Sequence, residues 1–267
     1  MKRKLSSFSL LLLLCVLLLT ASSFLPSPLL RRCGTVFSFL FCSLSAFFLP
    51  ASSELRPDAK DIPVFPQRPR SAALLLLLPA FVLLIAALSL VTTQLFSSLG
   101  VPLPRQEPLA SLFLIILFDV ALAAFTEELF FRGILYSLLA PYGDLPAILG
   151  TSLAFSLLHG NLYQIPYALA AGILLGFLRL YSGSLFLPFL FHLANNLVSL
   201  LCRDLPTGLF FLLSGTGTLL GLLFFFRNER KRPLLFPPEP GNPHFFRDLV
   251  FSPFPVFAVL MLLTAFI

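Results

Sequence analysis

Residues 72–98 read AALLLLLPAFVLLIAALSLVTTQLFSS and contain no charged side chain. A helix needs roughly 20 predominantly apolar residues to cross the hydrocarbon core of a bilayer. The stretch is long enough to do so. It therefore predicts a transmembrane helix.

The rest of the chain has the same apolar character. Hydrophobic residues make up 58% of the sequence and charged residues only 11%, against roughly 25% charged in an average soluble domain. Further segments of this kind occur at about residues 8–30, 35–50, 109–140, 146–160, 163–181, 184–202, 206–226 and 251–267. They are apolar all round, whereas the strands of a membrane barrel would alternate polar and apolar residues. We predict an all-α fold, a polytopic transmembrane helical bundle of about eight or nine spans.

The bundle divides into three parts along the sequence. Residues 1–108 would form N-terminal spans, of which the first fits a signal anchor or a signal peptide because Lys2, Arg3 and Lys4 precede it. We expect this first span to stay uncleaved. Residues 109–202 would form the core that carries the chemistry, and residues 203–267 C-terminal spans with a basic cytoplasmic loop.

The net charge of +6 reflects membrane topology rather than nucleic-acid binding, because the basic residues lie in short clusters beside apolar segments. With a cytoplasmic N-terminus and every segment crossing, most of these residues fall in cytoplasmic loops: Lys2, Arg3, Lys4, Arg56, Lys60, Arg68, Arg70, Arg227, Arg230, Lys231, Arg232 and Arg247. The opposite loops hold only Arg31, Arg32, Arg105 and Arg203. The positive-inside rule then predicts an integral protein of the plasma membrane with its N-terminus in the cytoplasm.

Several polar residues lie inside the apolar segments, where a charged side chain costs at least about 2.5–3.5 kcal/mol. Such residues usually face a partner or a water-filled cavity. They are Asp119, Glu127, Glu128, Arg132, His159, Arg179, His192, Asn195 and Asn196. Arg179 is expected to extend toward the lipid headgroups from the end of its segment. We assign no role to Asp119.

The first cluster is residues 127–132, which read EELFFR. Glu128 and Arg132 stand at i and i+4 in the favoured acid-first order, so they can form an ion pair on one helix face. Glu127 is turned by about 100° from Glu128 and has no evident local partner. An unpaired carboxylate at membrane depth is a candidate general base.

Two further clusters follow on separate segments. His159 ends the run Phe155-Ser-Leu-Leu-His, and His192 and Asn196 share a helix face at i and i+4. If residues 141–146 form the turn of a helical hairpin, Glu127 and His159 both lie roughly 22–26 Å from it, at one depth. His192 fits less well, since it is only about 14 Å past the next turn, and would need a tilt, a kink or a re-entrant helix.

These motifs resemble the CPBP family, the type II CAAX prenyl endopeptidases and bacteriocin-processing (Abi) enzymes described as intramembrane glutamic proteases. The family pattern is Glu-Glu-x-x-x-Arg, then Phe-x-x-x-His, then His-x-x-x-Asn, on three membrane helices, and all three occur here in order over about residues 109–202. The resemblance implies that the catalytic residues are Glu127, His159, His192 and Asn196. Glu127 and His159 would activate a water molecule and His192 and Asn196 would bind the oxyanion. Glu128 and Arg132 would hold their helix in place, and Glu128 could also assist at the water.

No cofactor is expected, and three alternatives stay open. A zinc-dependent membrane protease could use His159, His192 and Glu127 as ligands, although the sequence lacks the His-Glu-x-x-His helix of zinc peptidases and any close cysteine pair. A non-catalytic immunity or scaffold protein would use the polar residues to hold helices together. A transporter would use them as a proton relay, but no internal repeat supports this.

A peptide or a membrane protein is the expected substrate, with lipid as the surroundings and no nucleic acid as partner. Prenylated CAAX proteins are substrates of eukaryotic relatives, while a peptide pheromone or a bacteriocin leader fits equally well. The sequence indicates neither the cleavage site nor the oligomeric state.

Overall fold

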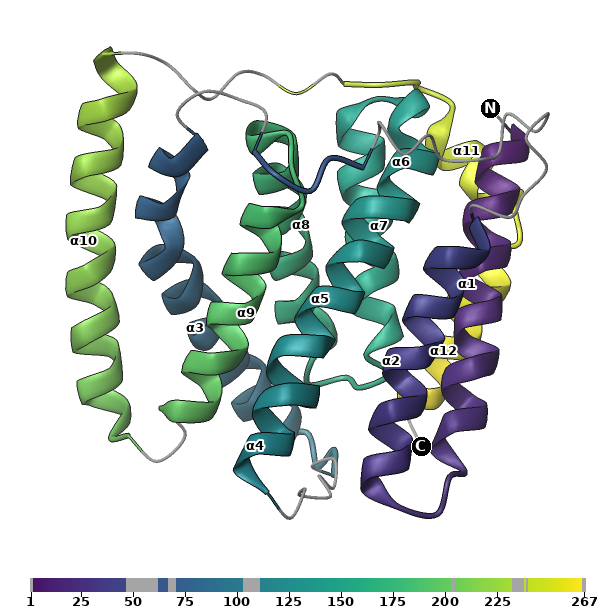
Figure 1. The fold of residues 1–267 in the computed structure, drawn as a ribbon, viewed down its shortest axis with the longest axis horizontal. Helices are drawn as coiled ribbons and strands as arrows, with labels where there is room; N and C mark the ends of the chain where they lie inside the picture. The colour runs from purple at the N-terminus through teal and green to yellow at the C-terminus, as the bar shows by residue number, and fades with distance from the viewer. Residues whose placement is uncertain are drawn as a thin grey trace.

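The computed structural model describes residues 2–46, 62–66, 71–102, 111–202, 205–231, 238 and 240–265. Within these ranges all regular secondary structure is helical, and the helices stand side by side with their long axes roughly aligned (Figure 1). The predicted all-α bundle is therefore confirmed.

Successive long helices run in alternating directions across the bundle, and the elements from α4 to α6 together form one of them (Figure 1). Their bounds are α1 Lys2–Ser23, α2 Pro28–Ser45, η3 Ser71–Leu77, α3 Leu78–Ser98, α4 Leu112–Ile115, η4 Ile116–Leu122, α5 Ala123–Glu128, η5 Leu129–Leu135, α6 Tyr136–Leu139, η6 Ala140–Tyr142, α7 Asp144–Leu158, α8 Ile165–Ser182, α9 Phe186–Leu201, α10 Thr207–Lys231, α11 Phe245–Val250 and α12 Phe254–Ala265. Of the η elements, η3 and η6 are 3₁₀ helices, and η4 and η5 are π-helices.

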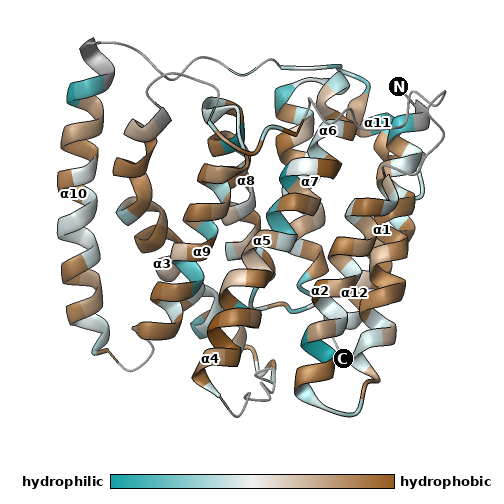
Figure 2. Cartoon of the chain, in the orientation of Figure 1, coloured by the Kyte–Doolittle hydropathy of each residue, from teal (hydrophilic) through white to brown (hydrophobic). Residues whose placement is uncertain are grey.

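The molecule is an integral membrane protein. Helices long and apolar enough to cross a bilayer are Lys4–Ser23, Ala72–Ser98, Ile165–Ser182 and Thr207–Asn228, with shorter apolar helices at Asp144–Leu158, Phe186–Leu201 and Phe254–Ala265. Figure 2 shows hydrophobic residues over most of the length of these helices. The total of eight or nine spans stays a prediction.

The boundary between the first two helices differs from the predicted one. We expected a break between residues 30 and 35, but α1 ends at Ser23 and α2 begins at Pro28. Proline is favoured in the first helical turn, and the Ser27 side chain caps the new helix by accepting a hydrogen bond from the Leu30 amide at 3.2 Å. The local capping signals outweigh the polar pair at positions 31 and 32, which lies inside α2.

The segment predicted as one span at residues 109–140 is a continuous helix from Leu112 to Leu139 with two π-helical stretches, η4 and η5. The i→i+5 hydrogen bonds of a π-helix place more residues in each turn, so η5 rises less than seven α-helical residues would. π-helical stretches occur frequently at functional sites, and α5, which carries both glutamates, lies between these two.

The first helix packs as an integral part of the bundle. Leu5, Phe8, Leu12 and Cys15 are buried on one side of α1 in the main apolar core, which α12 also enters. The ring of Phe8 stacks on that of Phe254, with centroids 5.9 Å apart. Helices from the two ends of the described chain thus lie against each other.

Helices α7 and α8 pack closely, because small residues line their contact. A methyl group added at Gly172 would lie 2.9 Å from the Ser152 Cβ, and one at Gly176 would lie 2.9 Å from Ile148. Such approach of two backbones is typical of helix pairs in membranes. It fixes α7, and with it the position of His159, against the α8 backbone.

The N-terminal end of α1, the last turn of α10 and α11 lie at the same edge of the bundle, at the top of Figure 1. This agrees with a common side for the N-terminus and the basic loop, while the orientation in the membrane stays a prediction. Several of the basic residues used to predict it lie outside the described residues: Arg56, Lys60, Arg68, Arg70, Arg105, Arg203 and Arg232.

Candidate active site

The predicted pair of Glu128 and Arg132 is confirmed. Arg132 Nη1 donates to Glu128 Oε1 at 2.9 Å, and the two side chains are 0% and 1% exposed. Arg132 Nη2 also donates to the Gly172 carbonyl of α8 at 3.1 Å. The buried Arg132 guanidinium therefore balances the charge of Glu128 on its own helix, and its bond to the Gly172 carbonyl ties that helix to α8.

His192 contacts both glutamates. Its Nδ1 atom lies 2.8 Å from Glu128 Oε1, and its Nε2 atom lies 3.9 Å from Glu127 Oε2. An ionised carboxylate can only accept, so Nδ1 carries the hydrogen of the first contact. His192 thus reaches the depth of the glutamates, although counting residues from the preceding turn placed it at a different depth.

His159 lies at the C-terminal end of α7, followed by Gly160 in the left-handed region with φ of 56°. Its Nδ1 atom lies 2.8 Å from the carbonyl oxygen of Phe155. Because a carbonyl only accepts, this bond places the hydrogen on Nδ1 and leaves a lone pair on Nε2 of the neutral ring. Helix geometry thus selects the tautomer whose Nε2 can accept a proton.

Phe155 joins the parts of the site through its ring. The ring makes edge contacts with the imidazoles of His159 and His192, at centroid distances of 4.8 Å and 5.8 Å. The Arg132 guanidinium carbon lies 4.5 Å from the same ring centroid. Sequence reasoning gave Phe155 no role of its own, although it begins the second motif.

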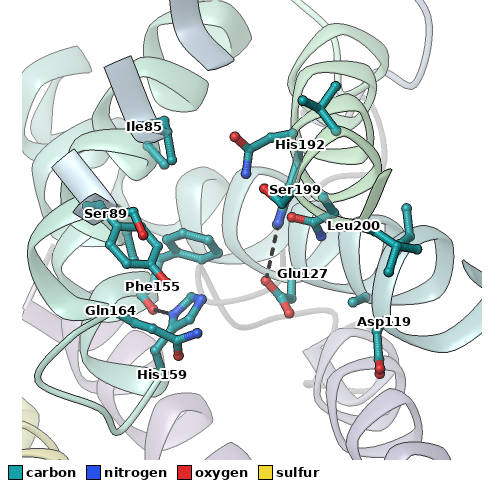
Figure 3. Close-up of a pocket in the computed structure, with 18 of the residues that line it drawn as sticks. Ile85, Ser89, Asp119, Glu127, Phe155, His159, Gln164, His192, Ser199 and Leu200 are labelled. Atoms are coloured by element: carbon teal, nitrogen blue, oxygen red, sulfur yellow. Dashed lines mark hydrogen bonds and ion pairs between the residues drawn. The ribbon is translucent and has the colours of Figure 1, made fainter. Parts of the chain in front are cut away.

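One cavity of about 1520 Å³ brings the predicted catalytic residues together. Glu127, His159, His192 and Asn196 all line it, while Glu128 and Arg132 are not part of its wall. Figure 3 shows His159 on one side of this cavity and Glu127 and His192 on the other. Residues from α5, α7 and α9, far apart in sequence, thus face one space inside the bundle.

The prediction for Arg179 is wrong. Its side chain does not extend to the headgroups: the residue is 7% exposed, and its Nε donates to the Arg132 carbonyl at 3.3 Å. The guanidinium also lies 5.5 Å from the ring centroid of Tyr136. The hydrogen bond to the Arg132 carbonyl and the contact with the Tyr136 ring stabilise the Arg179 cation inside the bundle, so the side chain does not need to reach water.

Asp119 lies in η4 at the wall of the same cavity and forms an ion pair with Arg32 of α2, with Oδ1 and Nε 2.9 Å apart. The side chains are 37% and 26% exposed. The acid is therefore partly exposed and holds α2 against the helix that carries the glutamates.

Among the described residues, no three His, Cys, Asp or Glu side chains are grouped as ligands of one metal ion would be. The zinc alternative requires His159, His192 and Glu127 together. In each imidazole Nδ1 already makes a hydrogen bond, so only Nε2 would be available to a metal. Metal independence stays a prediction.

Comparison with known proteins gives a match to a family model. Residues 109–198 match the family model for type II CAAX prenyl endopeptidase Rce1-like proteins. This range contains the predicted catalytic residues together with Glu128 and Arg132, while α1, α2, α3 and residues after 198 add further side chains to the cavity wall. No curated protein and no solved structure shows significant similarity to the chain.

Proposed function

We propose that the protein is an intramembrane endopeptidase that hydrolyses a peptide bond with a water molecule activated by Glu127 and His159. The match of residues 109–198 to the family model for type II CAAX prenyl endopeptidases supports the reaction class. The observation that carries this mechanism is the convergence of Glu127, His159, His192 and Asn196 on one cavity inside an apolar bundle. A peptide or membrane-protein substrate follows from the family.

Water activation requires groups that can accept a proton. The Glu127 carboxylate and the His159 Nε2 lone pair both face the cavity, and the hydrogen bond from His159 Nδ1 to the Phe155 carbonyl keeps that lone pair available. As water attacks the substrate carbonyl, its proton passes to this pair and then to the leaving amine. The C–N bond of the substrate peptide breaks without the formation of a covalent enzyme intermediate.

The oxyanion is assigned to the face of α9. Nδ1 of His192 bonds to Glu128 Oε1 at 2.8 Å, so the ring must also carry a hydrogen on Nε2 if it is to donate to the oxyanion. A protonated ring donates from Nδ1 to Glu128 and from Nε2 into the cavity, where the amide of Asn196, one turn further along α9, supplies the second donor.

The cavity is large enough for an extended peptide together with an apolar group, since small-molecule pockets are roughly 300–1,000 Å³ and this cavity is about 1520 Å³. Apolar side chains of α3 and α10 line part of its wall, including Phe81, Ile85 and Phe210. We expect substrates to enter from the bilayer and the protein to act in the plasma membrane with its N-terminus in the cytoplasm.

The experiment is a comparison of new protein termini in membranes that carry the wild-type protein or the Glu127→Gln variant. The amide keeps the shape of the side chain and removes the base, so the variant should insert and fold normally and generate none of the wild-type cleavage products. Asp119→Asn is the matched control, because it makes the same change at another acid of the cavity wall and should leave the cleavage products unchanged. Near-normal cleavage by Glu127→Gln would rule out the mechanism.

A further inference from the structure

A second polar cluster lines the cavity outside the three motifs. It consists of Ser89 of α3, Tyr167 of α8 and Gln164, the residue directly before α8. Figure 3 shows Ser89 and Gln164 on the His159 side of the cavity, facing Glu127 and His192 across it. Polar side chains on the wall of a cavity inside an apolar bundle need a partner.

The Tyr167 hydroxyl holds this cluster together, because it lies close enough to interact with both the Gln164 and the Ser89 side chains. A side-chain amide has two N–H donors and an oxygen with two lone pairs. One bond to Tyr167 therefore leaves Gln164 able to donate and to accept at the same time. A group that can do both is complementary to a peptide backbone, which offers one donor and one acceptor at each residue.

A substrate peptide inside the bilayer needs such a partner. The bond to be cleaved must be extended to admit the water, so the backbone around it loses the internal hydrogen bonds of a helix. Each backbone group left unpaired in hydrocarbon costs several kcal/mol. The cavity wall must replace these bonds, and His192 and Asn196 are committed to the oxyanion.

We propose that Gln164 is a positioning residue that binds the substrate backbone next to the scissile bond, donating from its amide to a carbonyl and accepting from an N–H. Tyr167 and Ser89 hold the amide in the orientation that does this. The inference rests on the proposed function. It extends the substrate site to α3, which lies outside the matched residues 109–198.

The kinetic test uses purified protein in detergent and a quenched fluorescent peptide that spans the main cleavage site of the wild-type protein. A hydrogen bond made equally to substrate and transition state affects KM alone, so Gln164→Leu should raise KM about tenfold and change kcat less than about twofold. Tyr167→Phe, which removes only the hydroxyl that orients the amide, should raise KM about threefold. Gln94→Leu makes the same change at an exposed residue of α3 and should leave both constants unchanged.

A second arm identifies the contact from the substrate side. Peptides with one backbone N–H replaced by N-methyl, at each position flanking the cleaved bond in turn, are assayed with the wild type and Gln164→Leu. At one position the wild type should lose about tenfold in kcat/KM, and the variant should lose almost nothing further.

Unchanged KM in both Gln164→Leu and Tyr167→Phe, or equal N-methyl losses in the variant and the wild type at every position, would overturn the assignment of Gln164 alone. Cleavage that persists in Glu127→Gln would instead overturn the proposed function. The two failures are thus separate observations.

Discussion

Nδ1 of His192 lies 2.8 Å from Oε1 of Glu128, the same oxygen that accepts from Arg132 at 2.9 Å. Glu128 therefore connects the helix of the glutamates to α9. From sequence, Glu128 is only the partner of Arg132. In the folded protein it also orients the histidine that we assign to the oxyanion.

Arg132→Ala should reduce the amount of folded protein. The change leaves Glu128 inside the bundle without its cation and removes the bond to the Gly172 carbonyl. Breaking one side of a buried ion pair typically costs about 3–5 kcal/mol, which exceeds half of the stability of many proteins. Fluorescence-detected size-exclusion chromatography of solubilised membranes measures the yield. A normal yield together with lost cleavage would assign Arg132 to the chemistry instead.

Phe155→Leu should lower kcat about tenfold or more at nearly normal yield. Leucine keeps an apolar side chain but loses the ring edges that contact His159 and His192, and small displacements of catalytic groups cost up to about 10²-fold in rate. Phe131→Leu is the control, because this buried ring packs against Phe155 at 5.1 Å, and no contact with either imidazole is found for it among the described residues. Equal losses in both variants would indicate general loosening of the core.

The features set by local periodicity and by ion pairing could be predicted from the sequence. Apolar length predicts the helices, and i,i+4 spacing predicts the contact of Glu128 with Arg132. Counting residues from the turn predicts that Glu127 and His159 reach one depth, and both line the cavity. These inferences depend on geometry within one helix or one hairpin.

The features that depend on packing between distant helices could not be predicted. The bond from His192 to Glu128 joins two helices that are 64 residues apart in sequence, so no local spacing predicts it. The π-helical stretch at Leu129–Leu135 likewise has no sequence signal in this segment. Arg179 lies near the end of an apolar segment, where a residue that reaches the lipid headgroups would be expected. Its partner is instead a backbone carbonyl on another helix. The polar cluster of Ser89, Gln164 and Tyr167 brings α3 and α8 together, and no sequence motif relates these three residues.

The N-terminus and the loop after α10 should both face the cytoplasm. Single cysteines at Ser53 and Asn228 test this in intact cells with a membrane-impermeant thiol reagent, in a background whose native cysteines are replaced by serine. Neither should be labelled, because the positive charges near both positions favour the cytoplasmic side. Ser98→Cys, exposed at the opposite end of α3, is the positive control and should be labelled.

Strong labelling of Ser53→Cys or Asn228→Cys in intact cells would contradict this topology. If Ser98→Cys is then unlabelled, the whole bundle is inverted in the membrane. Labelling after permeabilisation shows that each cysteine is reactive, so that an unlabelled position reports its side and not its burial.

Chelation should leave the activity intact. Purified protein is freed of metal with an excess of chelator and assayed with the same fluorescent peptide. The rate should change little, because in the proposed mechanism Glu127 and His159 activate water without an ion. In that mechanism, donors on His192 and Asn196 stabilise the oxyanion that a Lewis acid would otherwise stabilise. Asn196→Ala is the complementary change, and the loss of one oxyanion donor should lower kcat by about 10²–10³-fold with little effect on KM. If chelation abolishes cleavage, zinc restores it and Asn196→Ala is nearly silent, the enzyme is a metalloprotease and the roles of Glu127 and His192 must be those of ligands.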